Sequence, residues 1–128
     1  SDLNVTQKKK ELDTQGITGY IKKTAGGNEE EYQKKIDQFR KILETKYESD
    51  DFNKRTGKYE MKSYSPEVIK YILGEQDLKS ENYLTFEKLN KEQTKELEHA
   101  IKDLDNLYND NSNGSKFYNY LDKKYDNY

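Results

Sequence analysis

Residues 28–47 read NEEEYQKKIDQFRKILETKY, and this stretch indicates the fold more strongly than any other part of the chain. Its large apolar side chains recur at intervals of four, three and four residues, which places them on one stripe of a helix. They are Tyr32, Ile36, Phe39 and Leu43. Asn28 and Glu31 have the spacing of a capping box, in which the first side chain accepts a hydrogen bond from the backbone N–H three residues later. The stretch therefore predicts an amphipathic helix over 28–47.

A second helix is predicted over 66–73. Ser65 is a favoured capping residue, and Pro66 suits the first helical position because its missing N–H would have no partner there. Gly74 adopts a left-handed conformation easily, so it can end the helix. The apolar residues that predict its buried face are Val68, Ile69, Ile72 and Leu73.

A third helix is predicted over 91–108, with Asn90 and Gln93 as its capping box. Its apolar stripe consists of Leu97, Ile101, Leu104 and Tyr108. Turn-forming residues at 109–114 then end this helix. Beyond the turn, helical spacing of apolar side chains predicts a shorter fourth helix over 115–127. These side chains are Phe117, Leu121 and Tyr125.

Two other stretches contain strand-forming residues. Residues 57–64 partly alternate polar and apolar side chains, and residues 82–88 include the run Tyr-Leu-Thr-Phe. We predict that the two stretches pair as a short ribbon supported by the helices, because a two-stranded ribbon is only marginally stable alone. If they join further extended segments, the fold becomes α+β instead.

The expected fold class is therefore mainly α. We predict a small irregular bundle of about four helices, with the two-stranded ribbon as an addition. Residues 28–128 are expected to form a single small helical domain. Residues 1–27 are expected to form a partly flexible N-terminal arm and loop, with the loop over 15–27.

The composition excludes several classes of protein. The 128 residues include 23 basic and 25 acidic side chains, for a net charge of −2, and no cysteine. A disulfide scaffold and a thiolate metal site are therefore excluded, and no stretch is apolar enough to span a membrane. Nucleic-acid binding is not expected, since the lysine runs at 8–10 and 22–23 are short and lie near acidic residues.

No catalytic, cofactor-binding or metal-binding residues are predicted. His99 is the only histidine, and it lies off the apolar stripe of its helix, so we expect it at the surface without a catalytic partner. Glu92 and Glu96 share one helical face, which we interpret as a solvated face and not as a pair of glycosidase acids. Phosphate-binding glycine loops, nucleophile elbows and zinc-binding helix motifs do not occur. The chain is therefore predicted not to be an enzyme.

Residues 109–114 carry a pattern that resembles the start of an EF-hand calcium loop. Asn109, Asn111 and Asn113 alternate as oxygen ligands would, and Gly114 occupies the sixth position. The first ligand lacks a charge, and the twelfth position is Tyr120 where a bidentate Glu is required. We therefore predict a polar turn between helices and no metal site.

Tyrosine is the most unusual feature of the composition. The chain has 12 tyrosines and no tryptophan, and four of the tyrosines lie within residues 118–128. Tyrosine is enriched at protein interfaces, because its ring supplies apolar area while its hydroxyl stays hydrated. The candidate partner-binding residues are Tyr118, Tyr120 and Tyr128. The alternative interpretation is that tyrosine completes the core of a chain that is poor in leucine.

These observations favour a non-catalytic protein-binding module. The bias toward Lys, Asn, Glu and Tyr is typical of AT-rich bacteria, and a secretory or lipoprotein leader is one explanation for a chain that begins with Ser1. We predict an exported or envelope-attached bacterial protein, such as the soluble part of a small lipoprotein or a secreted host- or competitor-interaction factor. Its partner would be another protein, and a lipid anchor could precede Ser1. One alternative is a cytosolic immunity protein or phage-encoded inhibitor or regulator, and a small carboxylate hydrolase is another.

Overall fold

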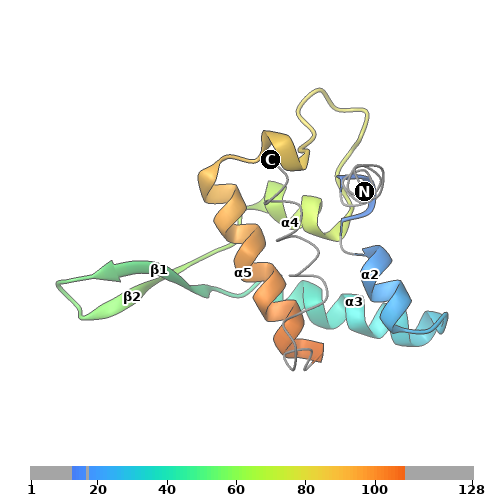
Figure 1. The fold of residues 1–128 in the computed structure, drawn as a ribbon, viewed down its shortest axis with the longest axis horizontal. Coiled ribbons are helices and arrows are strands. Elements are labelled where there is room, and N and C mark those ends of the chain that lie inside the picture. The colour runs from blue at the N-terminus through green and yellow to red at the C-terminus, as the bar shows by residue number, and fades with distance from the viewer. Residues whose placement is uncertain (1–12, 17, 109–128) are drawn as a thin grey trace, which may run out of the picture.

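The computed structural model describes residues 13–16 and 18–108, and the fold is α with one small β-hairpin (Figure 1). The elements are α2 (Thr18–Thr24), α3 (Glu29–Leu43), β1 (Tyr47–Asn53), β2 (Lys58–Lys62), α4 (Pro66–Leu73), the 3₁₀ helix η1 (Phe86–Lys88) and α5 (Lys91–Tyr108). The prediction of a mainly α fold with a two-stranded ribbon is confirmed at this level. The predicted helix over 115–127 lies outside the described residues.

Helix α3 confirms most of the predicted 28–47 helix. Its first turn is capped by Asn28, whose Oδ1 accepts a hydrogen bond from the Glu31 N–H at 3.1 Å. The helix ends at Leu43, four residues earlier than predicted, and the chain then enters β1 at Tyr47. Of the predicted stripe, Ile36, Phe39 and Leu43 are buried in the core.

The other two predicted helices have the predicted bounds. Helix α4 begins with Pro66 and ends at Gly74, which is left-handed with φ of +68°. Helix α5 begins with a reciprocal capping box, in which Asn90 and Gln93 each donate a backbone N–H to the other's side chain, at 2.9 and 2.8 Å. Ser65 lies at the cap of α4, but its hydroxyl donates to Glu96 Oε2 at 3.0 Å and does not cap the helix.

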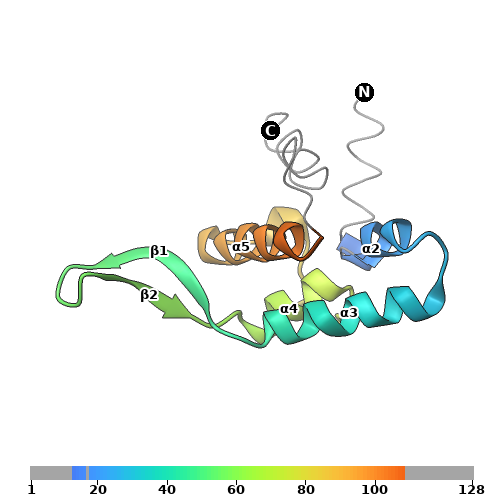
Figure 2. The ribbon, with the colours of Figure 1, turned by 90° about the horizontal axis from the view of Figure 1, so that it is seen from below.

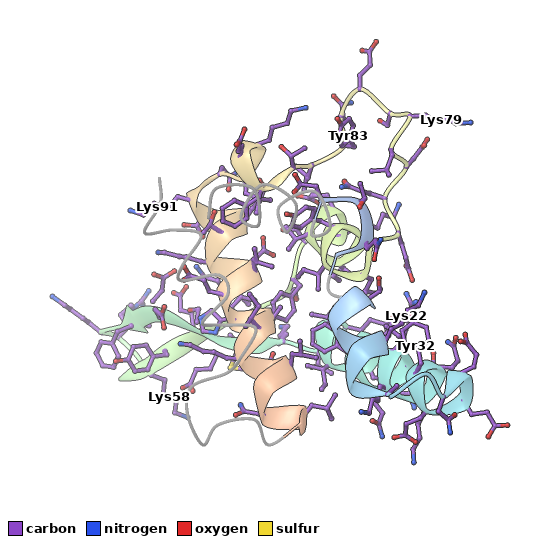
Figure 3. All side chains as sticks on the ribbon, turned by 45° about the vertical axis from the view of Figure 1, so that its right-hand side comes forward. Lys22, Tyr32, Lys58, Lys79, Tyr83 and Lys91 are labelled. Carbon is purple, nitrogen blue, oxygen red and sulfur yellow. The ribbon has the colours of Figure 1, made fainter. Side chains whose placement is uncertain are left out.

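The prediction of a loop over 15–27 is wrong at residues 18–24, which form α2. This segment offers no repeating apolar pattern, so its sequence gives little helical signal. Its structure depends on Ile21, which is fully buried in the core shared with the later helices. Lys22 also places its ammonium over the Tyr32 ring of α3, with the Nζ atom 5.2 Å from the ring centroid (Figure 3).

The ribbon is confirmed, but one of its two predicted strands is wrong. Residues 58–62 pair antiparallel with 47–53, not with 82–88. A hairpin between neighbouring segments closes a shorter loop than the predicted pairing would, so its entropic cost is lower. The 82–88 segment instead contains η1, where Phe86 is buried and its N–H donates to Asp13 Oδ1 at 2.8 Å.

The core lies between two layers of helices. Figure 2 shows α2 and α5 on one side and α3 and α4 on the other, with the hairpin extending beyond them. The buried side chains include Ile21, Phe39, Val68, Tyr71, Leu97, Ile101 and Leu104. The helical part of the chain therefore supplies its own core, and the far end of the hairpin takes no part in it.

A bidentate ion pair joins α3 to the chain after α4. Arg40 donates from Nη1 to Glu75 Oε2 at 3.0 Å and from Nη2 to Oε1. This hydrogen bond lowers the pKa of Glu75 below its ordinary value of 4.5. Because the pKa of Glu75 is lower in the folded chain than in the unfolded chain, the ion pair stabilises the fold at pH values above the unfolded pKa. This stability is lost as the pH falls through the folded pKa.

We expect Glu75→Gln to reduce stability at neutral pH by up to about 1 kcal/mol, because the pair is partly exposed and screened by solvent. The difference should shrink below pH 4.5 and vanish once Glu75 is protonated in the folded wild type. Urea denaturation across this pH range measures it. Glu81→Gln, which removes an exposed acid outside the described ion pairs, is the control. A difference that persists unchanged at low pH would contradict the expectation.

Candidate functional site

The β1–β2 hairpin protrudes from the helical body, and it is the most prominent feature of the molecule (Figures 1 and 2). Phe52 faces Tyr59 across the strands, and Asn53 faces Lys58 before the turn. Within the described residues each strand pairs only with the other, so both outer edges of the hairpin have free backbone groups. Beyond its base, the hairpin is therefore open to a partner.

The turn at the end of the hairpin is held by its own hydrogen bonds. The Asn53 side chain accepts from the Arg55 N–H at 2.9 Å and from the Thr56 N–H at 3.3 Å. Its carbonyl accepts from the Gly57 N–H at 2.8 Å. Gly57 has φ of +70°, which glycine adopts without strain. The turn therefore needs no support from the helical body.

One face of the hairpin carries exposed apolar side chains, and we call Phe52, Tyr59 and Met61 the hairpin face. Tyr59 and Met61 are two residues apart on β2, so they point to the same side, and Phe52 lies opposite Tyr59. The Phe52 and Tyr59 rings meet edge to face, with their centroids 5.3 Å apart. The three residues are 54%, 49% and 56% exposed, and none belongs to the core.

The tip of the hairpin is positively charged, whereas an acidic and a basic side chain pair nearer the body. Between Phe52 and Tyr59 the chain has three basic residues and no acidic one, and we call Lys54, Arg55 and Lys58 the tip cations. None of them forms an ion pair with another described residue. Nearer the body, Asp51 pairs with Lys62. The tip therefore has a positive charge that the described part of the chain does not neutralise.

An aromatic cluster fixes the base of the hairpin on α5. The Tyr47 ring of β1 stacks on Tyr64, with centroids 4.4 Å apart, and contacts the His99 ring at 4.8 Å. His99 Nε2 lies 3.7 Å from Asp50 Oδ2. The prediction of a surface His99 is therefore wrong, because β1 covers this side of α5 and leaves the side chain only 17% exposed.

Two carboxylates of α5 complete this attachment. Asp103 Oδ2 accepts a hydrogen bond from the Tyr64 hydroxyl at 2.8 Å. Glu96, predicted to lie on a solvated face, is buried with 6% exposure and accepts from both the N–H and the hydroxyl of Ser65. That prediction is wrong because the segment after β2 crosses over Glu96 and supplies its donors. The base of the hairpin is consequently held on α5 both where the chain enters β1 and where it leaves β2.

The two tyrosines of this cluster have raised pKa values. Burial, followed by the hydrogen bond with Asp103, raises the pKa of Tyr64 strongly. Burial also raises the pKa of Tyr47, and the nearby Glu96 charge adds to the effect. Both phenols therefore keep their protons at neutral pH. Among residues 13–16 and 18–108, no three His, Asp or Glu side chains are grouped to hold a metal ion.

The residues predicted to bind a partner are elsewhere in the chain. Tyr118, Tyr120 and Tyr128 lie outside the described residues, as does the turn at 109–114, so these expectations stay predictions. The hairpin face was not predicted, although Tyr59 and Met61 alternate with charged residues in the predicted strand. The missing signal was Asn53 and Gly57, whose spacing marks a hairpin turn and would have placed Phe52 on a strand.

Comparison with known protein families, with curated proteins and with solved structures finds no match to this chain. No helix among the described residues has the length and apolar character needed to cross a bilayer. What the chain does is therefore inferred from its own residues.

Proposed function

We propose that this chain is a non-catalytic protein-binding module and that the hairpin face is its contact surface. The observation that carries the proposal is the exposure of three large apolar side chains, Phe52, Tyr59 and Met61, on a hairpin that protrudes from the body. Aromatic residues and methionine are enriched in protein interfaces, and aromatic residues often dominate the binding energy. The hairpin face has this composition in a position that a partner can reach.

A purely structural role does not explain these side chains. The core is built by α2, α3, α4, α5 and η1, and the hairpin contributes to it mainly through Tyr47 and Tyr64 at its base. Beyond the base, the edge-to-face pair of Phe52 and Tyr59 contributes only about 0.2–1 kcal/mol to strand pairing, and about half of each residue stays exposed. Because exposed aromatic and Met side chains gain little from folding, their presence supports a contact made outside the chain.

The firm base of the hairpin supports the same proposal. A protruding ribbon without tertiary support would lose conformational freedom when it binds, and this loss would weaken binding. Here the Tyr47, Tyr64 and His99 rings and the buried Glu96 hold the base on α5. The hairpin is thus positioned before a partner arrives.

An exported or envelope-attached location in a bacterium is part of the proposal. Its support comes from the sequence: the composition is typical of AT-rich bacteria, which often export small domains without cysteine. The partner would then be a protein of the envelope, of a host or of a competitor.

The proposal predicts that the double substitution Phe52→Ser/Tyr59→Ser strongly weakens binding while the fold is retained. Peptides that bind the immobilised wild-type chain are selected from a library of random displayed peptides. The affinity of each selected peptide is then measured for the wild type and for the double variant. We expect affinity to fall at least about tenfold, which corresponds to the loss of a single strong contact. Circular dichroism checks that both proteins keep the same helical content.

Leu78→Ser is the matched control, because Leu78 is a similarly exposed apolar residue, at 45%, on a loop away from the hairpin. The selected peptides should bind the Leu78→Ser variant as tightly as they bind the wild type. The proposal fails if no clone is selected, or if the selected clones bind the double variant as tightly as the wild type.

A further inference from the structure

We infer that the partner presents an acidic, extended segment, in which Asp or Glu side chains contact the tip cations while neighbouring apolar side chains cover the hairpin face. This inference rests on the proposed function and adds the chemistry of the partner to it. It follows from the position of charge on the hairpin and not from the net charge of the chain, which is −2.

The positive charge at the tip is free to act on a partner. Two of the three acidic residues of β1 have a basic neighbour near the base, where Asp51 pairs with Lys62 and Asp50 lies beside His99, while the third, Glu48, lies opposite Met61 and away from the tip. Lys54, Arg55 and Lys58 are exposed and have no such partner among the described residues. Arginine binds carboxylates in a bidentate arrangement, so Arg55 is suited to an Asp or Glu side chain.

The tip cations adjoin the aromatic part of the hairpin face. Lys54 and Arg55 lie in the turn directly beyond the Phe52–Tyr59 pair, and Lys58 precedes Tyr59 in the chain. A ligand that lies along the hairpin face and covers the two rings therefore brings one of its ends close to the tip cations. Complementary charge at that position would speed association and fix the orientation of the ligand.

The shape of the surface favours a peptide segment over a lipid bilayer. A hairpin that inserts into a bilayer needs apolar side chains at its leading end, but residues 53–58 read Asn-Lys-Arg-Thr-Gly-Lys and are polar throughout. The apolar side chains lie behind the turn, along the strands. Such a row matches an extended chain, which can also hydrogen-bond to a free strand edge.

The test uses three synthetic peptides that share one row of Phe and Leu residues. The intervening residues are Asp and Glu in the first peptide, Asn and Gln in the second and Lys in the third. Binding to the full chain is measured by fluorescence anisotropy at low and at high salt. We expect the acidic peptide to bind at least about tenfold more tightly than the amide peptide at low salt, and this advantage to shrink at high salt because exposed charges are screened.

The triple variant Lys54→Glu/Arg55→Glu/Lys58→Glu should lose the preference for the acidic peptide and gain one for the lysine peptide. The control, Lys34→Glu/Lys79→Glu/Lys91→Glu, changes the net charge equally at exposed positions away from the hairpin and should keep the wild-type preference (Figure 3 labels Lys79 and Lys91). Loss of the preference in both variants would overturn the inference, because net charge and not the tip would then explain it.

Further measurements test whether the hairpin binds a membrane or a second copy of the chain instead. Vesicles of phosphatidylserine and phosphatidylcholine that bind the chain more tightly than the acidic peptide, with dependence on the tip cations, would overturn the inference in favour of a membrane. Self-association through the tip, seen as a wild-type dimer that the triple variant lacks, would overturn it in favour of a second copy. If selected peptides depend on Phe52 and Tyr59 but lack acidic residues, the inference fails while the proposed function stands.

Discussion

Gly74→Ala is expected to destabilise the fold by about 2–5 kcal/mol, measured by urea denaturation. Gly74 ends α4 with φ of +68°, a conformation that costs about 1–2 kcal/mol for a residue with a Cβ atom. In addition, a Cβ atom at this position would overlap the backbone carbonyl of Gln15. The chain near Gln15 therefore packs against the end of α4 at a distance that only glycine allows.

The same crossing requires a second glycine. Gly16 has φ of +58°, and a Cβ atom added there would overlap the Ile72 carbonyl oxygen. Gly16→Ala should consequently have an effect comparable to that of Gly74→Ala. Because backbone atoms form both contacts, neither can be relieved by a change of side-chain rotamer.

Gly57→Ala is the control that separates the cost of the left-handed conformation from the cost of the backbone overlap. Gly57 has nearly the same φ, +70°, but a Cβ atom there would meet nothing within 4 Å. Only the conformational cost should remain, at about 1–2 kcal/mol. If Gly74→Ala destabilises the protein no more than Gly57→Ala does, the close approach of the two backbone segments is not what requires glycine.

The second large effect is expected at Phe39, where substitution by Ala should cost about 3–5 kcal/mol and lower Tm by roughly 10 °C or more. Phe39 is fully buried on α3, in the core that α4 and α5 share. Removal of the ring loses its burial and leaves a cavity that the surrounding side chains fill only in part. Thermal and urea denaturation measure the change.

Phe52→Ala removes the same ring from the hairpin and is the matched comparison. Because Phe52 is 54% exposed, lies outside the core and loses only its cross-strand contact with Tyr59, the substitution should change stability by about 1 kcal/mol or less. This contrast also bears on the proposed function. If Phe52→Ala destabilised the protein as strongly as Phe39→Ala, the hairpin face would have a structural role and its exposure would no longer support a binding site.

The successful sequence predictions concern interactions between residues close in the chain. The caps of α3 and α5 connect residues three positions apart, and Pro66 and Gly74 define the ends of α4 by their own backbone preferences. The apolar stripe of α5 likewise follows from a repeat within one segment, and its Leu97, Ile101 and Leu104 are buried. These features need no knowledge of the remaining chain.

The candidate site could be predicted only in part. The strand around Tyr59 and Met61 was expected from its alternation, but its partner strand was not, because Tyr47–Asn53 is rich in acidic residues that strands rarely contain. The predicted binding residues, Tyr118, Tyr120 and Tyr128, lie outside the described residues. Composition suggested that aromatic residues mark the binding site, but it did not indicate which ones are exposed.

The three predicted helices that the structure describes, the caps of α3 and α5 and the mainly α class follow from single segments, because short-range hydrogen bonds and apolar periodicity are local properties. Folding of the whole chain was needed to make α2 helical, to cover Glu96 and His99, and to bring Phe52 beside Tyr59 on an exposed face. Each of these features depends on contacts between different segments of the chain, and such contacts form only when the chain folds.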